Sequence, residues 1–178
     1  MVLPLRTERL TLSVLTAADR AAFVRYRRDP DVARWQSWST TSSDADVDAL
    51  LGDQPAGIEP GSGRWVQIAI HDAGGTLQGD VAVRPLSDQP DTYEVGVTLA
   101  PAAQGRGIAT EALAALVDVL FAGLGAHRVF AVSDARNESV ARLLRRSGFR
   151  HEGRNVDADW FKGEWTSLDT WAVLRRDR

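Results

Sequence analysis

The chain contains 178 residues, of which 44% are apolar and 25% are charged, and its formal net charge is −3. These values are close to the average of globular domains, so they exclude a disordered or collagen-like chain and disfavour a basic nucleic-acid-binding domain. Cysteine is absent, which excludes disulfides, a thiol nucleophile and metal sites with cysteine ligands. We expect one domain over residues 1–178, because domains commonly contain about 100–200 residues.

The N-terminal segment and the distribution of apolar residues bear on location. Arg6, Glu8 and Arg9 interrupt the start of the chain, which is unlike the apolar region of a signal peptide. No apolar run approaches the roughly 20 residues that a membrane span needs. We therefore expect a cytoplasmic protein with no membrane partner and no nucleic-acid partner.

The first part of the chain is expected to contain one strand followed by short helices. The expected elements are the strand Glu8–Leu15 and helices over Thr16–Arg28, Pro30–Gln36 and Ser43–Leu51. Apolar alternation predicts the strand. Thr16 with Asp19, and Ser43 with Asp46, have the spacing of helix capping pairs. Gly52–Gly63 is rich in glycine and proline and is expected to be a loop.

The rest of the chain alternates strands with two helices. The expected strands are Arg64–His71, Leu77–Arg84, Thr92–Leu99, Arg128–Ser133, Phe149–Gly153 and Thr166–Arg175, and the expected helices are Gly107–Ala122 and Asn137–Ser147. Asp72–Gly75 predicts a hairpin turn, and residues 154–164 are expected to form a loop. Hairpins imply antiparallel pairing, whereas a helical crossover implies a parallel step. We therefore expect an α/β (mixed α+β) fold, with one mixed sheet and helices on both faces.

The segment that carries the most chemical information is Gln104–Leu113, which lies between an expected strand and an amphipathic helix. Glycines at a helix N-terminus let backbone N–H groups converge, and the helix dipole adds positive potential, so this segment is suited to bind a phosphate. An ordinary glycine-rich turn explains Gly105 and Gly107 equally well. A dinucleotide-binding oxidoreductase would need glycine or alanine where Thr110 stands, and a P-loop would need Gly-Lys-Ser/Thr.

Gln104-x-x-Gly107-x-Ala109 resembles the Q/R-x-x-G-x-G/A pyrophosphate loop of the GNAT superfamily of acyl-CoA N-acyltransferases. Segments that also resemble this family are Leu5–Leu10, Asp29–Trp35, Tyr93–Gly96, Asn137–Gly153 and Leu168–Leu174. The resemblance is closest to the branch that contains the ribosomal-protein N-terminal alanine acetyltransferases. It implies the GNAT fold, with a mixed, mostly antiparallel sheet of about seven strands and helices on both faces.

The resemblance also implies acetyl-CoA as the co-substrate. The residues that it places against acetyl-CoA are Val97, Thr98, Leu99, Gln104, Gly105, Arg106, Gly107, Ile108, Ala109, Thr110 and Asn137. Asn137 alone is equally explained as the N-cap of its helix. No metal is expected, because the three histidines are scattered and no His-Glu-x-x-His or EF-hand pattern occurs.

Acetyl transfer needs a group that takes a proton from the acceptor ammonium. Glu94 is the candidate general base, acting through water, and its alternative is a solvated glutamate on the wet face of a strand. Ser139 is the candidate proton donor to the departing thiolate. Many relatives have a serine three residues after the asparagine, where this chain has Val140, so Ser139 lies about 100° away around the helix.

The acceptor is less well defined by the sequence. Trp35 and Trp38 are candidate acceptor-binding residues, and loop tryptophans can alternatively cover a homodimer interface. The expected function is acetyl transfer to a primary amine, either a protein N-terminus or a small molecule, by direct attack in a ternary complex. The alternative function is a non-catalytic acyl-CoA-binding or sensing domain.

Overall fold

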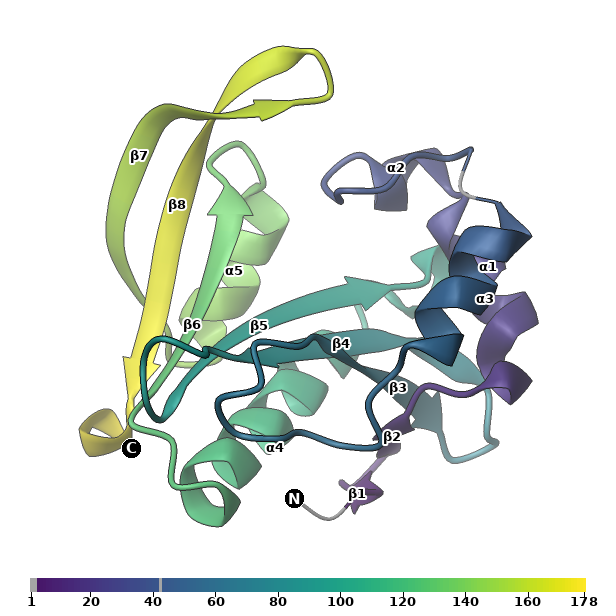
Figure 1. Cartoon of the computed structure of the whole chain (residues 1–178), viewed down its shortest axis with the longest axis horizontal. Helices are drawn as coiled ribbons and strands as arrows, with labels where there is room; N and C mark the ends of the chain where they lie inside the picture. The colour runs from purple at the N-terminus through teal and green to yellow at the C-terminus, as the bar shows by residue number, and fades with distance from the viewer. Residues whose placement is uncertain (1–2, 42) are drawn as a thin grey trace.

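Eight strands form one mixed sheet in the computed structural model, which describes residues 3–41 and 43–178 (Figure 1). The strands are β1 (Leu5–Arg6), β2 (Leu10–Val14), β3 (Val66–Asp72), β4 (Leu77–Pro85), β5 (Thr92–Leu99), β6 (Arg128–Asp134), β7 (Arg150–Phe161) and β8 (Glu164–Leu174). Their order across the sheet is β1-β2-β3-β4-β5-β6-β8-β7. Met1, Val2 and Ser42 of the expected domain lie outside the described residues.

The expected mixed, mostly antiparallel sheet is confirmed. Among the described strands, β5 and β6 pair in parallel and every other neighbouring pair is antiparallel. The sheet has eight strands instead of the expected seven, because Leu5–Arg6, before the expected first strand Glu8–Leu15, forms an additional strand. Thr7 turns the chain between them, since its N–H donates to the Leu10 carbonyl at 2.9 Å.

The helices begin where the expected capping residues stand. The helices are α1 (Arg20–Arg27), α2 (Pro30–Ala33), α3 (Asp44–Gly52), α4 (Ile108–Gly123) and α5 (Glu138–Arg146), with 3₁₀ turns η1 (Ala17–Asp19), η2 (Pro101–Ala103) and η3 (Arg175–Asp177). The Ser43 hydroxyl accepts the Asp46 N–H at 3.1 Å, which satisfies one of the free amides at the start of α3. Thr16 forms the expected box with Asp19, although η1 precedes α1 there.

The two faces of the sheet carry separate apolar layers. Helices α4 and α5 pack on the face of Val81, Val83, Tyr93 and Val95. Helices α1 and α3 pack on the other face, around Ala69. Because side chains alternate along a strand, the residues of β5 between its buried tyrosine and valines, including Gly96, face the α1 and α3 side. Within the described residues, no helix combines the length and the apolar character that a bilayer crossing needs.

The C-terminal part forms a long hairpin, and the expected loop over residues 154–164 is wrong. Strand β7 continues to Phe161 and pairs with β8 up to Phe161 opposite Glu164. Lys162 (φ 50°) and Gly163 (φ 91°) form the turn, as left-handed residues do in tight hairpins. Most of β7 is exposed at the sheet edge, so it lacks the apolar alternation that marks a strand in sequence.

Strands β5 and β6 separate after a short paired region (Figure 1). The pairing runs from Thr92 opposite Arg128 to Glu94 opposite Phe130. Beyond it, β5 continues to Leu99 and β6 to Asp134, with no pairing between them. The middle of the sheet therefore opens into a wedge whose two banks are main-chain edges.

Candidate functional site

The β5 bank of the wedge carries main-chain groups that pair with no other strand, and the Leu99 carbonyl accepts a hydrogen bond from the Gln104 side chain at 3.3 Å. The Ala100 N–H donates to the Gln78 carbonyl on β4 at 2.9 Å. Since main-chain groups alternate in direction along a strand, those of Val97 and Leu99 point toward the wedge. The main-chain groups of Thr98 point toward β4. Of the three residues of this strand expected to contact acetyl-CoA, Val97 and Leu99 would therefore do so through the main chain, and Thr98 through its side chain.

A loop with free amides follows this bank. The Gln104 N–H donates to the Pro101 carbonyl at 3.2 Å, and the first helical bond of α4 runs from the Glu111 N–H to the Gly107 carbonyl at 3.1 Å. Between them, the N–H groups of residues 105–110 have no acceptor among the described residues. Gly105 (φ 73°) and Gly107 (φ 79°) have the left-handed backbone conformation that glycine adopts most readily. Together with the dipole of α4, these amides are suited to bind an anion, and their contact with acetyl-CoA stays a prediction.

The loop is held by a cluster that the sequence did not indicate. Glu111 accepts hydrogen bonds from the Thr7 hydroxyl at 2.5 Å and from the Arg9 N–H at 3.0 Å. The Arg9 guanidinium forms an ion pair with Glu111 at 2.6 Å and donates to the Arg106 carbonyl at 3.2 Å. These contacts join the β1–β2 turn to the first turn of α4, more than ninety residues away, so no local pattern could reveal them.

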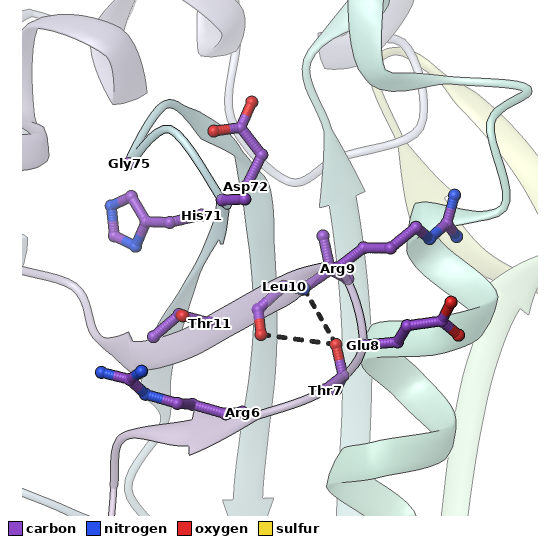
Figure 2. Close-up of a pocket in the computed structure, with 10 residues that line it drawn as sticks. Arg6, Thr7, Glu8, Arg9, Leu10, Thr11, His71, Asp72 and Gly75 are labelled. Atoms are coloured by element: carbon purple, nitrogen blue, oxygen red, sulfur yellow. Dashed lines mark hydrogen bonds between the residues drawn. The ribbon is translucent and has the colours of Figure 1, made fainter.

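A pocket of about 500 Å³ lies beside this turn, on the outer side of the sheet (Figure 2). Residues of the β1–β2 turn line it, together with His71, Asp72 and Gly75 of the β3–β4 hairpin. In Figure 2, Arg6 and Arg9 leave the turn in opposite directions, so Arg9 turns away from His71. The pocket therefore offers no converging set of catalytic groups.

A cleft of about 510 Å³ adjoins the wedge on the α1 and α3 side of the sheet. Its walls include the side chains of Arg27, Trp38, Trp65 and Asp80, and its floor includes Gly96 and Thr98. Gly96 leaves open space where a larger residue would stand, since a Cβ built there has no heavy atom within 4 Å. Val97 belongs both to this cleft and to the wedge.

Glu94 lies two residues before Gly96, on the same face of β5. Arg84 of β4 is directly opposite it, and the two side chains form an ion pair. The Arg84 guanidinium also lies 5.1 Å from the centre of the Trp65 ring, and Trp65 is a wall of the cleft. Glu94 is therefore an oriented, paired carboxylate, and its assignment as the base stays a prediction.

A second carboxylate, which sequence reasoning missed, lies in the cleft wall. Asp80 is only 2% exposed and accepts a hydrogen bond from the Tyr26 hydroxyl. Burial raises the pKa of Asp80 to about 6, against the opposing effects of the Tyr26 hydrogen bond and the Arg27 charge. The only sequence signal was an aspartate inside a strand of apolar residues, where an unpaired charge is costly.

The residues at the start of α5 lie on the other bank, just after β6 ends. The Asn137 side chain accepts the Val140 N–H at 3.1 Å, which confirms it as the N-cap. Ser139 is exposed, and its hydroxyl accepts a hydrogen bond from Arg142 at 3.3 Å. Contact of Asn137 with acetyl-CoA and proton donation by Ser139 stay predictions.

The two tryptophans expected at the acceptor site have different surroundings. Trp38 lines the cleft, where its ring lies 3.7 Å from the Arg27 guanidinium and its indole N–H donates to the Arg27 carbonyl at 3.1 Å. The Trp35 ring instead lies 5.9 Å from the guanidinium of Arg136, which follows β6. In the part of the chain that the structure describes, no group of three His, Cys, Asp or Glu side chains could hold a metal ion.

An open central sheet with free amides at a helix N-terminus is compatible with an enzyme that acts on acyl-CoA. A family model described as an acetyltransferase (GNAT) domain matches residues 9–150. The chain belongs to this GNAT acetyltransferase family. It is an acetyl-CoA-dependent N-acetyltransferase, which confirms the family, the enzyme class and the co-substrate expected from the sequence.

Relatives and solved structures agree with this family over nearly the whole chain. The uncharacterized N-acetyltransferase p20 of Bacillus licheniformis is 25% identical over 97% of both chains. The putative ribosomal N-acetyltransferase YdaF of Bacillus subtilis is 26% identical over 96% of this chain and 93% of the relative. A GNAT acetyltransferase structure from Bacillus anthracis has a TM-score of 0.85 at 22% identity, over 96% of this chain and 98% of that one. Spermidine N-acetyltransferase from Vibrio cholerae, in complex with CoA and spermine, has a TM-score of 0.83 at 19% identity, with the same coverage.

Proposed function

We propose that this enzyme transfers the acetyl group directly to a primary amine that enters through the cleft above Gly96. The observation that carries the proposal is the position of Val97 in both spaces. Its main chain faces the wedge, where the thioester arm is expected, and the same residue lines the cleft. An amine in the cleft therefore meets the thioester at β5, in a ternary complex.

The anion site supports the position of acetyl-CoA. The free amides of residues 105–110 suit a diphosphate, and the main-chain groups of Val97, together with the Leu99 N–H, suit the amides of the pantetheine arm. Holding both reactants at one strand lowers the barrier by as much as about 7–11 kcal/mol, because a bimolecular reaction becomes unimolecular.

The chemistry then requires proton movement at two points. The amine nitrogen attacks the thioester carbonyl, the C–S bond breaks, and the thiolate leaves. Glu94 takes the ammonium proton through a water molecule, and Arg84 orients its carboxylate. Ser139 or water returns a proton to the thiolate, whose ordinary thiol pKa of ~8.5 makes it a tolerable leaving group.

The proposal also covers the branch of the family, the acceptor, the extent of the domain, the location and the oligomeric state. The sequence similarity to a putative ribosomal N-acetyltransferase, and the structural similarity to Mycobacterium smegmatis RimJ in complex with CoA-disulfide, support a place near that branch. The acceptor is a protein N-terminus or a small amine. One domain over 1–178, a cytoplasmic location and a homodimer complete the proposal.

Release of free thiol from acetyl-CoA tests the proposal, with a panel of peptides, polyamines and amino acids as acceptors. We expect turnover with at least one class. The family match does not support the alternative of a non-catalytic acyl-CoA-binding or sensing domain. Calorimetric binding of CoA without turnover on the whole panel would contradict the proposed acceptor class.

A further inference from the structure

Arg27 is a buried cation in the acceptor cleft whose donors are unused. It is 9% exposed, although it lines the cleft. Its Nε has no hydrogen-bond partner, and no other described residue accepts a hydrogen bond from its guanidinium. Buried arginine ordinarily pairs with an acceptor, because an unpaired buried charge is costly. The Arg27 guanidinium is therefore free to bind an anion in the cleft.

The surroundings of Arg27 fix its position without satisfying it. The guanidinium carbon lies 4.3 Å from the centre of the Phe23 ring and 3.7 Å from that of the Trp38 ring. These cation–π contacts hold the guanidinium close to two aromatic rings, but they supply no hydrogen-bond acceptor. Burial lowers the pKa of Arg27, and the Asp80 and Tyr26 charges only partly oppose this effect.

Asp80 is near enough to act on Arg27 through its charge but forms no direct ion pair with it. Its carboxylate is engaged by the Tyr26 hydroxyl instead. The cleft wall thus presents one positive and one negative group, separated from each other. Because Asp80 is opposite Thr98 in the β4–β5 register, the negative group lies on the side of the reacting strand.

We propose that Arg27 binds a carboxylate of the acceptor, so that the acceptor is a small amino carboxylate, such as an amino acid. The planar guanidinium fork matches the two oxygens of a carboxylate. The acceptor ammonium then lies on the Asp80 side, beside Gly96. A polyamine would place a second positive charge near Arg27, where like charges repel. This inference rests on the proposed function, since it assigns the acceptor of the same site.

The experiment compares matched acceptors on the full-length enzyme with saturating acetyl-CoA. Phenylalanine and leucine are each paired with the amine that lacks the carboxylate, phenethylamine and isoamylamine, and spermidine is added. Rates are corrected for the fraction of free amine at the assay pH. We expect kcat/KM to be about 30-fold or more higher for the carboxylates, as for loss of one partner of a buried charge pair.

Two variants locate the effect at Arg27. Arg27→Met removes the guanidinium and is expected to abolish the preference, whereas Arg27→Lys retains the charge and is expected to keep part of it. Arg25→Met is the matched control, because Arg25 is an exposed arginine on the same helix and lies outside the cleft. CoA affinity, measured by calorimetry, shows whether each variant is folded.

The outcomes separate the inference from the function it rests on. Equal or faster turnover of spermidine or the decarboxylated amines overturns the inference and leaves acetyl transfer intact. A preference for carboxylates that persists in Arg27→Met also overturns it. If no amine reacts, calorimetry of the CoA-loaded protein with phenylalanine and leucine still tests Arg27. Binding that Arg27→Met removes supports the inference, and an absence of binding overturns it.

Discussion

Glu94 of β5 and Arg84 of β4 are directly opposite each other, and their side chains form an ion pair. The Glu94 side chain is 15% exposed, so it is not a freely solvated strand residue. A carboxylate fixed by a guanidinium has a defined direction for proton transfer, which a mobile glutamate lacks. The ion pair therefore strengthens the reason to test Glu94 by mutation, beyond what its position in the sequence suggested.

Glu94→Gln is expected to lower kcat by about 100-fold or more, because removal of a general base costs that much in comparable enzymes. CoA affinity is expected to stay within a factor of about two, since the wedge does not include the carboxylate. Thiol-release kinetics and calorimetry measure the two effects. Glu152→Gln is the matched control, because it breaks the Arg128–Glu152 pair outside the cleft. Unchanged kcat in Glu94→Gln would remove Glu94 from the mechanism.

Gly107→Ala is expected to weaken CoA binding by about tenfold or more, which corresponds to about 1.4 kcal/mol. An alanine at φ 79° would strain the backbone by about 1–2 kcal/mol and turn the loop amides. Gly125→Ala carries a similar strain at φ 71°, has open space around its Cβ, and lies at the other end of α4. The control should lose stability but keep its CoA affinity. An equal loss of affinity in both variants would contradict an anion site at residues 105–110.

Asp80 should make stability depend on pH in an unusual direction. Its pKa is about 6 when folded and 3.8 when exposed. A raised folded pKa means that the folded state holds the proton more tightly, so the stabilisation is full below about pH 4 and is lost as pH rises through about 6. Relative to Asp80→Asn, the wild type should therefore lose up to about 3 kcal/mol of unfolding free energy over this range. Parallel pH profiles, from denaturant unfolding, would contradict the burial of this charge.

Asp169→Asn provides the control of opposite sign. Hydrogen bonds from Arg154 lower the pKa of Asp169 to about 2, against the effect of burial and with help from His151. Its stabilisation is therefore present above about pH 4 and is lost as pH falls toward 2. The wild type should exceed this variant in stability at pH 7, and the difference should shrink in acid.

Glu111→Gln is expected to reduce the unfolding free energy by about 1–3 kcal/mol at pH 7, as for lost hydrogen bonds to a charged group. Burial raises the pKa of Glu111, but hydrogen bonds from Thr7 and Arg9 outweigh it and leave the pKa lowered. The difference from wild type should therefore diminish as pH falls below the usual glutamate range. Glu138→Gln, which breaks an exposed pair with Arg142, should cost less than about 1 kcal/mol. Equal effects would contradict a stabilising role of the contacts that Thr7 and Arg9 make with Glu111.

The features that the sequence predicted depend on neighbours in the chain. The capping residues Thr16, Ser43 and Asn137 act on amides within three residues of themselves, so their spacing alone was sufficient. The anion loop was predictable for the same reason, because Gly105 and Gly107 precede their own helix directly. The GNAT resemblance then supplied the sheet topology and the co-substrate.

The missed features depend on pairing between distant segments. Tyr26 and Asp80 are 54 residues apart, so although an aspartate is unusual among the apolar residues of its strand, no local pattern indicates its partner. The end of β7 was missed because its stability comes from β8, through contacts such as the ring pair of Trp160 and Trp165 at 5.4 Å. An edge strand exposed to water on both sides leaves no apolar pattern that local reading could detect.

The separation of β5 from β6 has a consequence for the lifetime of the protein. Beyond the short paired region, β5 and β6 form no hydrogen bonds with each other. A thioester ligand bound between them would supply hydrogen-bond partners there and would stabilise the folded sheet as well as take part in the reaction. A ligand that binds only the folded state adds about 2.7 kcal/mol when present at 100 times its Kd. Resistance to heat and to proteases should therefore increase with the acetyl-CoA concentration, so the lifetime of the enzyme would depend on the metabolic state of the cell.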